Sequence, residues 1–371
     1  MMSTITNNKY LWLKSMLNNF SHCLRLSLYL ALSFSILLTG NVQAKDTVII
    51  KAVGTWGYFT NYQKHEGPFW NKRIAAATNG EIVGEINPQT TLGLGGSEIM
   101  RLVKKGVFDF AFGLPAYVSP ESAIFEGADI SSLVQDIKVQ RKVADAYFPT
   151  LARAFKAKYN AKLMTLYPFP SQMIWCKKPV KNINELKDKK IRVYLTTLSD
   201  FVESVGAIPV NAPYKDVPQA LQSGKVDCAI TGTMSAYTSE LYRDAPYGFT
   251  LRVGWGLAFG AMNLDKWNIL SKQQQTILSQ EMETLTEQMW QETAKEDAIA
   301  LACLSNGPCT IGENGKMQFS EPSSDDLAIR DRLALEVILP RWAARCGPEC
   351  ATNWNRTVGK LLGMRAEIKL Q

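Results

Sequence analysis

The sequence contains very little histidine. Only His22 and His65 occur among its 371 residues, which nearly excludes a metal site built on several imidazoles and a histidine-rich catalytic centre. The basic excess is also small, with a formal net charge of +7. No dense Lys/Arg run with interleaved aromatic residues occurs, so we expect no nucleic-acid partner.

Motifs of common enzymes are missing as well. The sequence has no G-x-S-x-G, no G-x-x-x-x-G-K-[ST], no H-E-x-x-H and no EF-hand loop. The glycine-rich stretch at 92–96 lacks the G-x-G-x-x-G spacing and a lysine, and is interpreted as a turn before a helix that begins at Ser97. We therefore predict no catalytic residue, no cofactor and no metal ligand. An exported enzyme that uses Lys or carboxylate chemistry remains an alternative.

A hydrophobic run long enough to span a membrane is also lacking. The apolar stretch 26–38 is preceded by Lys9, Lys14 and Arg25 and followed by Val42-Gln43-Ala44. It is too short for the roughly 20 helical residues that cross a bilayer, and the order of charges, apolar stretch and small residues is typical of a secretory signal. We predict a signal peptide over 1–44, cleaved after Ala44, and export to the periplasm without stable membrane insertion. A signal anchor is the weaker interpretation.

Export makes the cysteines informative. One of the seven, Cys23, leaves with the signal, and the other six enter a compartment where disulfides persist. They are Cys176, Cys228, Cys303, Cys309, Cys346 and Cys350. The spacing of the last four favours disulfides in a C-terminal segment over a zinc site. Their pairing stays open, and Cys176 and Cys228 are interpreted equally well as a disulfide or as two buried thiols.

The exported part has the composition of a globular protein with two domains, with 46% hydrophobic and 20% charged residues in the whole chain. Its hydrophobic pattern alternates between strands and helices, which is typical of an α/β architecture. Strands are predicted at 47–53, 81–86 and 108–112, and helices at 69–77, 97–105 and 137–158.

An internal repeat is the most informative feature. The segment from Glu98 to Gly113 aligns without a gap with the segment from Asp216 to Thr231. Each copy has an acidic residue at the start of a helix, a glycine at its end (Gly106 and Gly224), and then an aspartate and a strand. Coincidence is the alternative, because such connections are common. Two similar lobes predict a ligand bound between them, with closure by hinge motion.

A long helix follows the repeat. Ser271-Lys-Gln-Gln274 has the form of a capping box, and an apolar stripe follows at Leu278, Met282, Leu285 and Met289. We expect this helix to pack across both lobes, and we expect a final helix at 333–344 before the last cysteine pair. The predicted divisions are lobe I at 45–167 with 252–270 returning to it, lobe II at 168–251, a bridging helix at 271–302, and a cysteine-containing segment at 303–371 that packs on the lobes.

Arg192 is the side chain singled out for binding. It stands alone as a cation in the short apolar strand 191–194. Such an arginine is either an exposed residue of an edge strand or a buried cation that awaits an anion, and its planar guanidinium suits a carboxylate. Taken alone, the exposed position is the simpler interpretation.

A family resemblance reverses that choice. Several motifs resemble the solute-binding proteins of TRAP (tripartite ATP-independent periplasmic) transporters, best between residues 90 and 275. These motifs are Lys178-Pro179-Val180-Lys181, Leu186-Lys187-Asp188-Lys189-Lys190-Ile191-Arg192-Val193, Gly206-Ala207-Ile208-Pro209-Val210 and Ala220-Leu221-Gln222-Ser223-Gly224-Lys225-Val226-Asp227. The resemblance implies a two-lobed periplasmic binding protein of type II-like α/β fold, with a cleft between the lobes and a long bridging helix. It also implies capture of an organic acid anion and delivery to ion-gradient-driven TRAP membrane subunits. A sensor that serves a signalling membrane protein is an alternative.

The resemblance assigns roles to individual residues. Arg192 matches the arginine that clamps the carboxylate, Tyr214 an aromatic residue that packs on the ligand, and Glu98 an acidic position that faces the cleft. Thr231 stands where the family has Asn, and Cys228 where it has Gly. A second basic residue is absent, with Ser171 and Gln172 near its place. Thr231 and Gln172 are therefore expected to be secondary polar contacts of a monocarboxylate-like ligand.

Further contacts are expected from aromatic residues at strand ends, although core packing is the commoner role of any single one. These residues are Trp56, Tyr58, Phe59, Phe112, Tyr117 and Trp255. Their number predicts an aromatic or otherwise bulky carboxylate. Asn263 is a further candidate polar contact, with a turn-forming role as the alternative.

Overall fold

The computed structural model describes residues 47–368. The predicted signal peptide and its cleavage after Ala44 lie outside the described residues. Within 47–368, no helix has both the length and the hydropathy that a membrane crossing requires.

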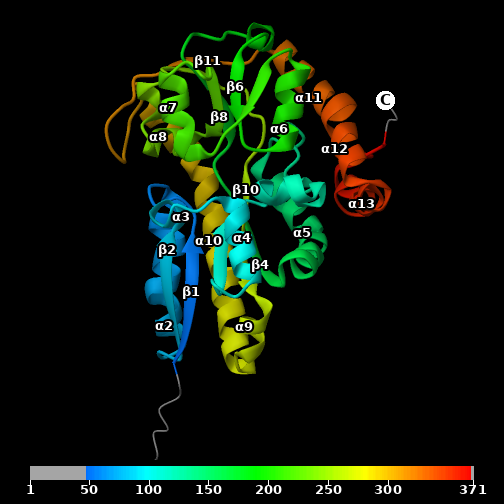
Figure 1. Cartoon of the computed structure of the whole chain (residues 1–371). Coiled ribbons are helices and arrows are strands. Elements are labelled where there is room, and N and C mark those ends of the chain that lie inside the picture. The colour runs from blue at the N-terminus through cyan, green and yellow to red at the C-terminus, as the bar shows by residue number, and fades with distance from the viewer. Residues whose placement is uncertain (1–46, 369–371) are drawn as a thin grey trace, which may run out of the picture. The chain divides into compact units, whose positions relative to one another are not determined.

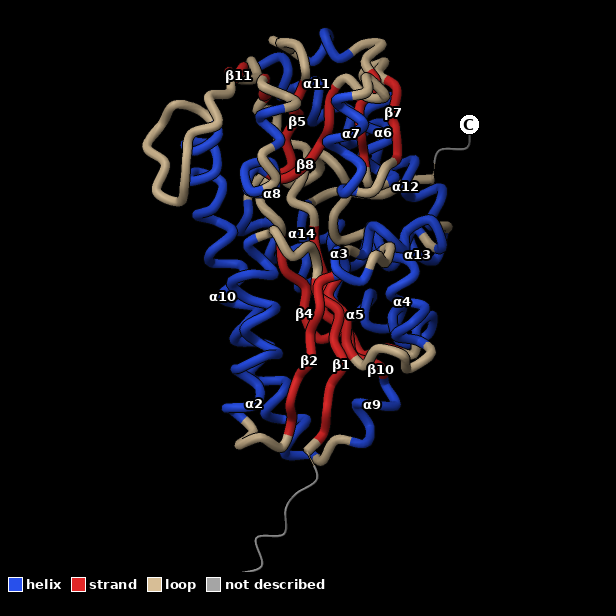
Figure 2. The backbone as a smooth tube through the Cα atoms, turned by 60° about the vertical axis from the view of Figure 1, so that its left-hand side comes forward, coloured by secondary structure: helices blue, strands red, loops and turns tan. Residues whose placement is uncertain are grey.

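Two separate β-sheets form the framework (Figures 1 and 2). Sheet A has the order β2-β1-β3-β10-β4 and sheet B the order β11-β9-β5-β8-β6-β7. The strands of sheet A are β1 (Val48–Gly54), β2 (Ile82–Pro88), β3 (Phe110–Gly113), β4 (Ala161–Pro168) and β10 (Leu257–Asn263). Those of sheet B are β5 (Gln172–Cys176), β6 (Lys190–Val193), β7 (Ile208–Asn211), β8 (Cys228–Gly232), β9 (Tyr247–Phe249) and β11 (Gln318–Ser320).

Helices surround both sheets. The α-helices are α2 (Ile74–Ala77), α3 (Gln89–Leu92), α4 (Gly96–Lys104), α5 (Ile137–Tyr159), α6 (Thr196–Ser204), α7 (Val217–Gln222), α8 (Thr233–Thr238), α9 (Leu264–Ile269), α10 (Lys272–Leu304), α11 (Ser324–Leu333), α12 (Leu339–Cys346), α13 (Pro348–Trp354) and α14 (Lys360–Leu362). Short π-helical segments are η1 (Asn61–Glu66), η2 (Phe69–Arg73), η8 (Ala334–Ile338) and η9 (Asn355–Gly359). Short 3-10 segments are η3 (Pro115–Glu121), η4 (Ala123–Glu126), η5 (Ile183–Leu186), η6 (Tyr214–Asp216) and η7 (Leu241–Arg243).

The two sheets share one topology. In sheet A, β1 pairs in parallel with β2 and β3, and β10 pairs antiparallel with β3 and β4. In sheet B, β6 pairs in parallel with β7 and β8, and β5 pairs antiparallel with β8 and β9. The order β2-β1-β3-β10-β4 therefore corresponds to β7-β6-β8-β5-β9. The two-lobed α/β fold predicted from the sequence is confirmed.

The sequence repeat occupies equivalent places in the two sheets. Gly106 ends the segment after α4 with φ +70°, and Gly224 ends the segment after α7 with φ +72°, where a side chain would be strained. The aspartates that follow make equivalent contacts. Asp109 exchanges backbone and side-chain hydrogen bonds with Lys51, and Asp227 does the same with Lys190. Both aspartates thus fix the start of a parallel strand pair, and the repeat is confirmed.

Helix α10 reaches from sheet A to sheet B, as Figures 1 and 2 show. Its predicted capping box is present at Ser271 and Gln274, and its apolar stripe is buried. Along sheet A, Trp290 and Thr293 donate hydrogen bonds to backbone carbonyl groups of β4. One turn later, Asp297 contacts the chain that enters sheet B.

The Asp297 carboxylate binds two of the three segments that join the sheets; the third is α10 itself, which leads from β10 towards β11. It accepts hydrogen bonds from the Ser171 backbone N–H at 2.9 Å and the Thr233 hydroxyl at 2.6 Å. It also accepts one from the Arg252 guanidinium at 3.1 Å. Ser171 lies between β4 and β5, and Arg252 between β9 and β10. A single carboxylate therefore fastens α10 to these two links.

The C-terminal segment contacts the residues that precede α5 and also helix α6. Trp342 and Trp354 donate indole hydrogen bonds to backbone carbonyl groups that precede α5, and Arg345 binds Asp200 of α6. The prediction of a final helix at 333–344 is wrong in one respect, because α13, η9 and α14 follow it. Pro348 stands at the first turn of α13, where a missing N–H costs nothing, so the helix restarts there.

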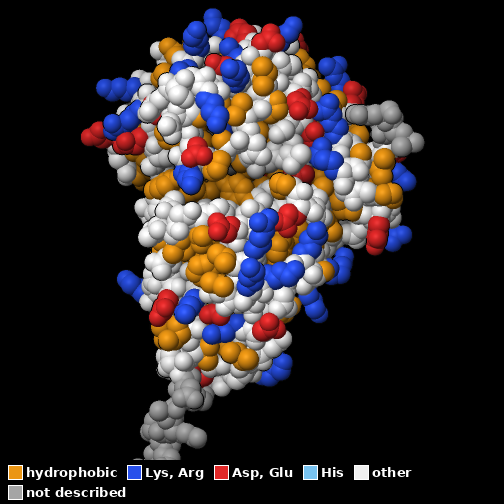
Figure 3. All heavy atoms as spheres, viewed as in Figure 1, with side chains coloured by type: hydrophobic (Ala, Val, Ile, Leu, Met, Phe, Trp, Pro, Cys, Tyr) orange, Lys and Arg blue, Asp and Glu red, His pale blue; other side chains and the backbone are white. Residues whose placement is uncertain are grey.

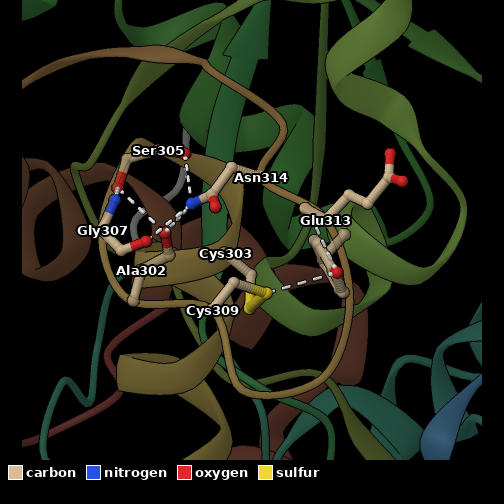
Figure 4. Close-up of a disulfide and its surroundings, with 8 residues drawn as sticks. Ala302, Cys303, Ser305, Gly307, Cys309, Glu313 and Asn314 are labelled. Carbon is tan, nitrogen blue, oxygen red and sulfur yellow. Dashed lines mark hydrogen bonds between the residues drawn. A yellow bond between two sulfur atoms is a disulfide. The ribbon is translucent and has the colours of Figure 1, made fainter.

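Three disulfides are present, and the preference for disulfides over zinc is confirmed. They join Cys176 to Cys228, Cys303 to Cys309 and Cys346 to Cys350. The first bridges directly opposed residues of β5 and β8. The second closes a loop after α10 (Figure 4), where the Asn314 amide donates to the carbonyl groups of Ala302, Ser305 and Gly307.

We predict that Asp297→Ala lowers the free energy of unfolding by about 3 kcal/mol, because it leaves a buried N–H, a buried hydroxyl and a guanidinium without their acceptor. Urea denaturation measures this change. The control is Asp145→Ala, which removes the exposed i,i+4 pair with Arg141 and should cost no more than about 0.5 kcal/mol. Equal effects of the two substitutions would contradict the role of Asp297.

Candidate functional site

Two adjoining cavities lie where the two sheets face each other. The larger has a volume of about 660 Å³ and is called the outer cavity. The smaller, called the inner chamber, shares Trp56, Tyr117, Tyr194 and Tyr214 with it. Further residues of the inner chamber are Phe59, Leu114, Phe169, Gln172, Arg192, Thr231, Ser235 and Gly256. Figure 3 shows hydrophobic side chains gathered in a band across this part of the surface.

The topology explains why these residues meet. Trp56 follows β1, Tyr194 follows β6 and Thr231 lies at the end of β8. These strands are parallel within their sheets, and the carboxyl ends of parallel strands form the usual ligand edge of an α/β sheet. Gln172 joins them from the other direction, because β5 runs antiparallel and begins at this edge. Both lobes therefore contribute their strand ends to one site.

In the described part of the chain, Arg192 is the only charged side chain that lines the inner chamber. It lies on β6 between β7 and β8, so the exposed edge-strand position considered from the sequence is wrong. The side chain is 1% exposed. It donates to the backbone carbonyl groups of Ala212 at 2.9 Å and Ile230 at 3.0 Å. Among residues 47–368, no carboxylate lies within 4 Å of the guanidinium.

Phenol rings lie beside the Arg192 guanidinium. The Arg192 guanidinium lies 5.3 Å from the ring centre of Tyr194 and 5.5 Å from that of Tyr214, a cation–π arrangement. Burial lowers the pKa of Arg192, while Tyr117, Tyr214 and Tyr194 act in the opposite direction. Burial also raises the pKa of Tyr117 to about 12, against the opposing effect of Arg192. Tyr117 is therefore a neutral hydrogen-bond donor beside a cation that lacks an anion.

Five of the eight predicted ligand-binding residues are brought together here. Arg192, Tyr214, Thr231, Gln172 and Trp56 all line the inner chamber. The Tyr214 hydroxyl is held 2.6 Å from Ser239 Oγ. The Gln172 amide donates to the Pro170 carbonyl at 2.8 Å. These bonds orient both side chains before any ligand binds.

The other three predicted residues are not brought to the cavities. Glu98 is exposed in the first turn of α4 and lines neither cavity. Trp255 is buried but packs under the Arg252 guanidinium, 4.8 Å from the ring centre. Asn263 caps α9 by accepting from the Lys266 N–H, and it donates to the Val103 carbonyl. Its turn-forming role, the alternative considered from the sequence, is the one that the structure has. Phe112, expected at the rim, is fully buried in the core.

The sequence interpretation missed the role of the glycine-rich stretch. Gly93, Leu94, Gly95 and Gly96 line the outer cavity. Tyr194 and Phe169 were missed as well, and both directly follow strands at the ligand edge. Their position next to a strand end was the signal that could have identified them.

A protein-family model matches most of this chain. Residues 60–328 match the family described as bacterial extracellular solute-binding protein, family 7, which is more than half of the chain. The chain belongs to this family. The resemblance to TRAP solute-binding proteins seen in the sequence is thereby confirmed.

Individual family members are more distant. An uncharacterised protein of Salmonella typhimurium is 26% identical over 282 residues, which cover 71% of this chain and 83% of that protein. A Bordetella pertussis receptor for pyroglutamic acid is 19% identical, with a TM-score of 0.75 over 84% of this chain and 99% of that one. A TRAP solute-binding protein of Desulfovibrio salexigens with bound orotic acid is 18% identical, with a TM-score of 0.74 over 85% of this chain and all of that one. The two solved structures have the same fold as this chain.

In this family 7 protein, a buried carboxylate lies beside the strand ends that precede two aromatic residues of the inner chamber, Trp56 and Phe169. Glu66 is fully buried and accepts hydrogen bonds from the Thr55 N–H at 2.7 Å and the Tyr167 hydroxyl at 2.7 Å. Thr55 precedes Trp56, and Tyr167 lies two residues before Phe169. Glu66 therefore fixes the ends of β1 and β4, from which these two rings extend. Burial raises the pKa of Glu66 to about 7, although its hydrogen bonds act in the opposite direction.

We predict that stability falls as the pH rises through this pKa. Because the folded-state pKa of Glu66 lies above its ordinary value of 4.5, the folded state holds the proton more tightly than the unfolded state between pH 4.5 and 7. Relative to Glu66→Gln, the parent should lose about 3 kcal/mol of unfolding free energy across this window. Urea denaturation at a series of pH values measures the difference. Parallel profiles would contradict the raised pKa.

Gly96 makes room for an aromatic residue of the site. A Cβ atom at this position would lie 2.2 Å from a ring carbon of Tyr117. The neighbouring Gly95 has no atom within 4 Å of a Cβ position, and its φ of −91° suits any residue. Two adjacent glycines of one loop thus have different steric roles.

We predict that Gly96→Ala lowers the free energy of unfolding by about 1–3 kcal/mol, because Tyr117 must move toward the cavity. Gly95→Ala is the matched control and should change stability by less than about 0.5 kcal/mol. Thermal or urea denaturation of both variants measures the two changes in stability. A harmless Gly96→Ala would mean that Tyr117 is not held in place by this contact.

Proposed function

We propose that this protein captures an organic acid anion between its lobes in the periplasm and delivers it to ion-gradient-driven TRAP membrane subunits. The observation that carries the proposal is the buried guanidinium of Arg192, which faces a cavity and has no carboxylate partner among the described residues. A buried cation is costly unless it is paired, and a bound carboxylate would supply the missing charge.

The proposed roles follow the geometry. Arg192 anchors the carboxylate, Tyr214 packs on the ligand, and Trp56 closes the chamber from the other lobe. Thr231 and Gln172 are secondary polar contacts. Glu98, Trp255 and Asn263 are left out of the proposal, because they line neither cavity.

The lobe boundaries predicted from the sequence are retained as part of the proposal, with lobe I at 45–167 and 252–270 and lobe II at 168–251. The links fastened by Asp297 then act as hinges. Closure would exclude water from the pair between Arg192 and the ligand. This strengthens an interaction that is worth only about 0–1 kcal/mol at an exposed surface.

Known ligands of similar proteins support a carboxylate. The Bordetella pertussis and Desulfovibrio salexigens proteins bind pyroglutamic acid and orotic acid. Both ligands carry one carboxylate on a ring, which one guanidinium can bind. We propose a receptor and not an enzyme, because the family is one of solute-binding proteins.

We predict that Arg192→Ala weakens carboxylate binding at least 100-fold, because the anion loses its only buried cation. Residues 45–371, with their disulfides intact, are titrated by calorimetry with pyroglutamate, orotate, phenylacetate and succinate. The control is Arg243→Ala in the same lobe, whose exposed side chain pairs with Glu240 and should leave affinity unchanged. If Arg192→Ala binds as tightly as the parent, or if no carboxylate binds the parent, the proposal is wrong.

A further inference from the structure

The charges of the two cavities limit the ligand to one carboxylate near its anchor. Among residues 47–368, Arg192 is the only charged residue of the inner chamber, and Lys215 the only one of the outer cavity. Lys215 is exposed, whereas Arg192 is 1% exposed. A second carboxylate beside the first would be buried without a cation, which is strongly unfavourable. Compact dicarboxylates therefore fit the inner chamber poorly.

The inner chamber has few uncharged polar side chains other than tyrosines, namely Gln172, Thr231 and Ser235. The Gln172 amide donates to the Pro170 carbonyl, and the Tyr214 hydroxyl is bound to Ser239. A ligand rich in hydroxyl groups would leave several of them unpaired after losing water. Sugar acids are therefore disfavoured as well.

Aromatic rings from both lobes surround the same space. The Phe59 ring centre lies 5.0 Å from Tyr214, 5.3 Å from Trp56 and 5.9 Å from Phe169. Trp56 lies 6.0 Å from Tyr117 and 6.2 Å from Tyr214. Most of these pairs meet edge to face, so the rings fill much of the inner chamber, whose volume of about 30 Å³ has room for a carboxylate but not for a ring. A ligand ring therefore lies in the outer cavity of about 660 Å³, where aromatic side chains also line the wall. A flat ring stacks on such side chains better than a puckered one of the same size.

We propose that the ligand is a monocarboxylate whose carboxyl group is attached, directly or through one methylene, to a planar aromatic or heteroaromatic ring. The carboxylate enters the inner chamber and binds Arg192 and the Tyr117 hydroxyl, and the ring lies in the outer cavity against Trp56, Tyr58 and Tyr214. Any part of the ligand beyond the ring extends further along the outer cavity. This inference rests on the proposed function and narrows it to one chemical class.

Paired probes test the planar ring separately from the carboxylate. Calorimetric titrations use benzoate and phenylacetate, their saturated counterparts cyclohexanecarboxylate and cyclohexylacetate, and succinate and gluconate. At least one aromatic probe should bind the parent at least 10-fold more tightly than its saturated counterpart, and more tightly than succinate and gluconate.

Two variants and a control test which side chains cause the preference for a planar ring. Tyr58→Leu and Trp56→Leu should each reduce the ratio of aromatic to saturated affinity at least 3-fold, because both side chains line the outer cavity. The control is Phe319→Leu, because Phe319 packs on Trp175 in sheet B and lines neither cavity. It should leave the ratio unchanged. Circular dichroism checks that each variant is folded. If one of the two site variants fails to fold, the other still tests the inference.

The outcomes separate this inference from the function on which it rests. Carboxylates that bind through Arg192 without preference for planar rings, or with succinate or gluconate ahead, would overturn the inference and leave the carboxylate receptor intact. An unchanged ratio in both site variants would also overturn it. Failure of every carboxylate to bind, or binding that survives Arg192→Ala, would overturn both.

Discussion

The binding site depends on one electrostatic constraint, which is a guanidinium buried without a carboxylate partner among residues 47–368. Arg192 is held by two backbone carbonyl groups and flanked by phenol rings, so its geometry is fixed although its charge is uncompensated. A fold in which every buried charge is paired would be more stable but would have nothing to offer an anion. The site is thus prepared for a ligand at the expense of stability.

The repeated sheet topology determines what surrounds this cation. Each lobe ends its parallel strands at the edge that faces the other lobe, so Trp56 of one lobe and Tyr214 of the other line the same chamber. Asp297 holds the β4–β5 and β9–β10 links against α10, which is itself the third connection between the sheets. Because these segments meet at one carboxylate, the connections between the sheets are gathered in one place.

Local sequence patterns predicted the strands and helices around the site better than they predicted which residues line it. The isolated arginine in strand 191–194 and the neighbours carried by the family resemblance, Tyr214, Thr231 and Gln172, all reach the inner chamber. Glu98 and Asn263 do not, because a helix start and a helix cap use the same residue types as a binding site. Trp255 was misplaced for a similar reason, since a tryptophan beside glycines is as suited to packing as to binding.

By itself, the sequence determined the alternation of strands and helices, the repeat, the capping box at Ser271 and the presence of an arginine in an apolar strand. These are local properties, fixed by hydrophobic periodicity and by the conformational preferences of glycine, serine and aspartate. Only the tertiary structure decided that Arg192 is buried without a carboxylate partner among the described residues, that Cys176 and Cys228 are joined, and which aromatic rings enclose one space. Those properties depend on distances between residues far apart in the chain. Such distances are set only when the strands pair and the carboxyl ends of the strands in the two sheets meet.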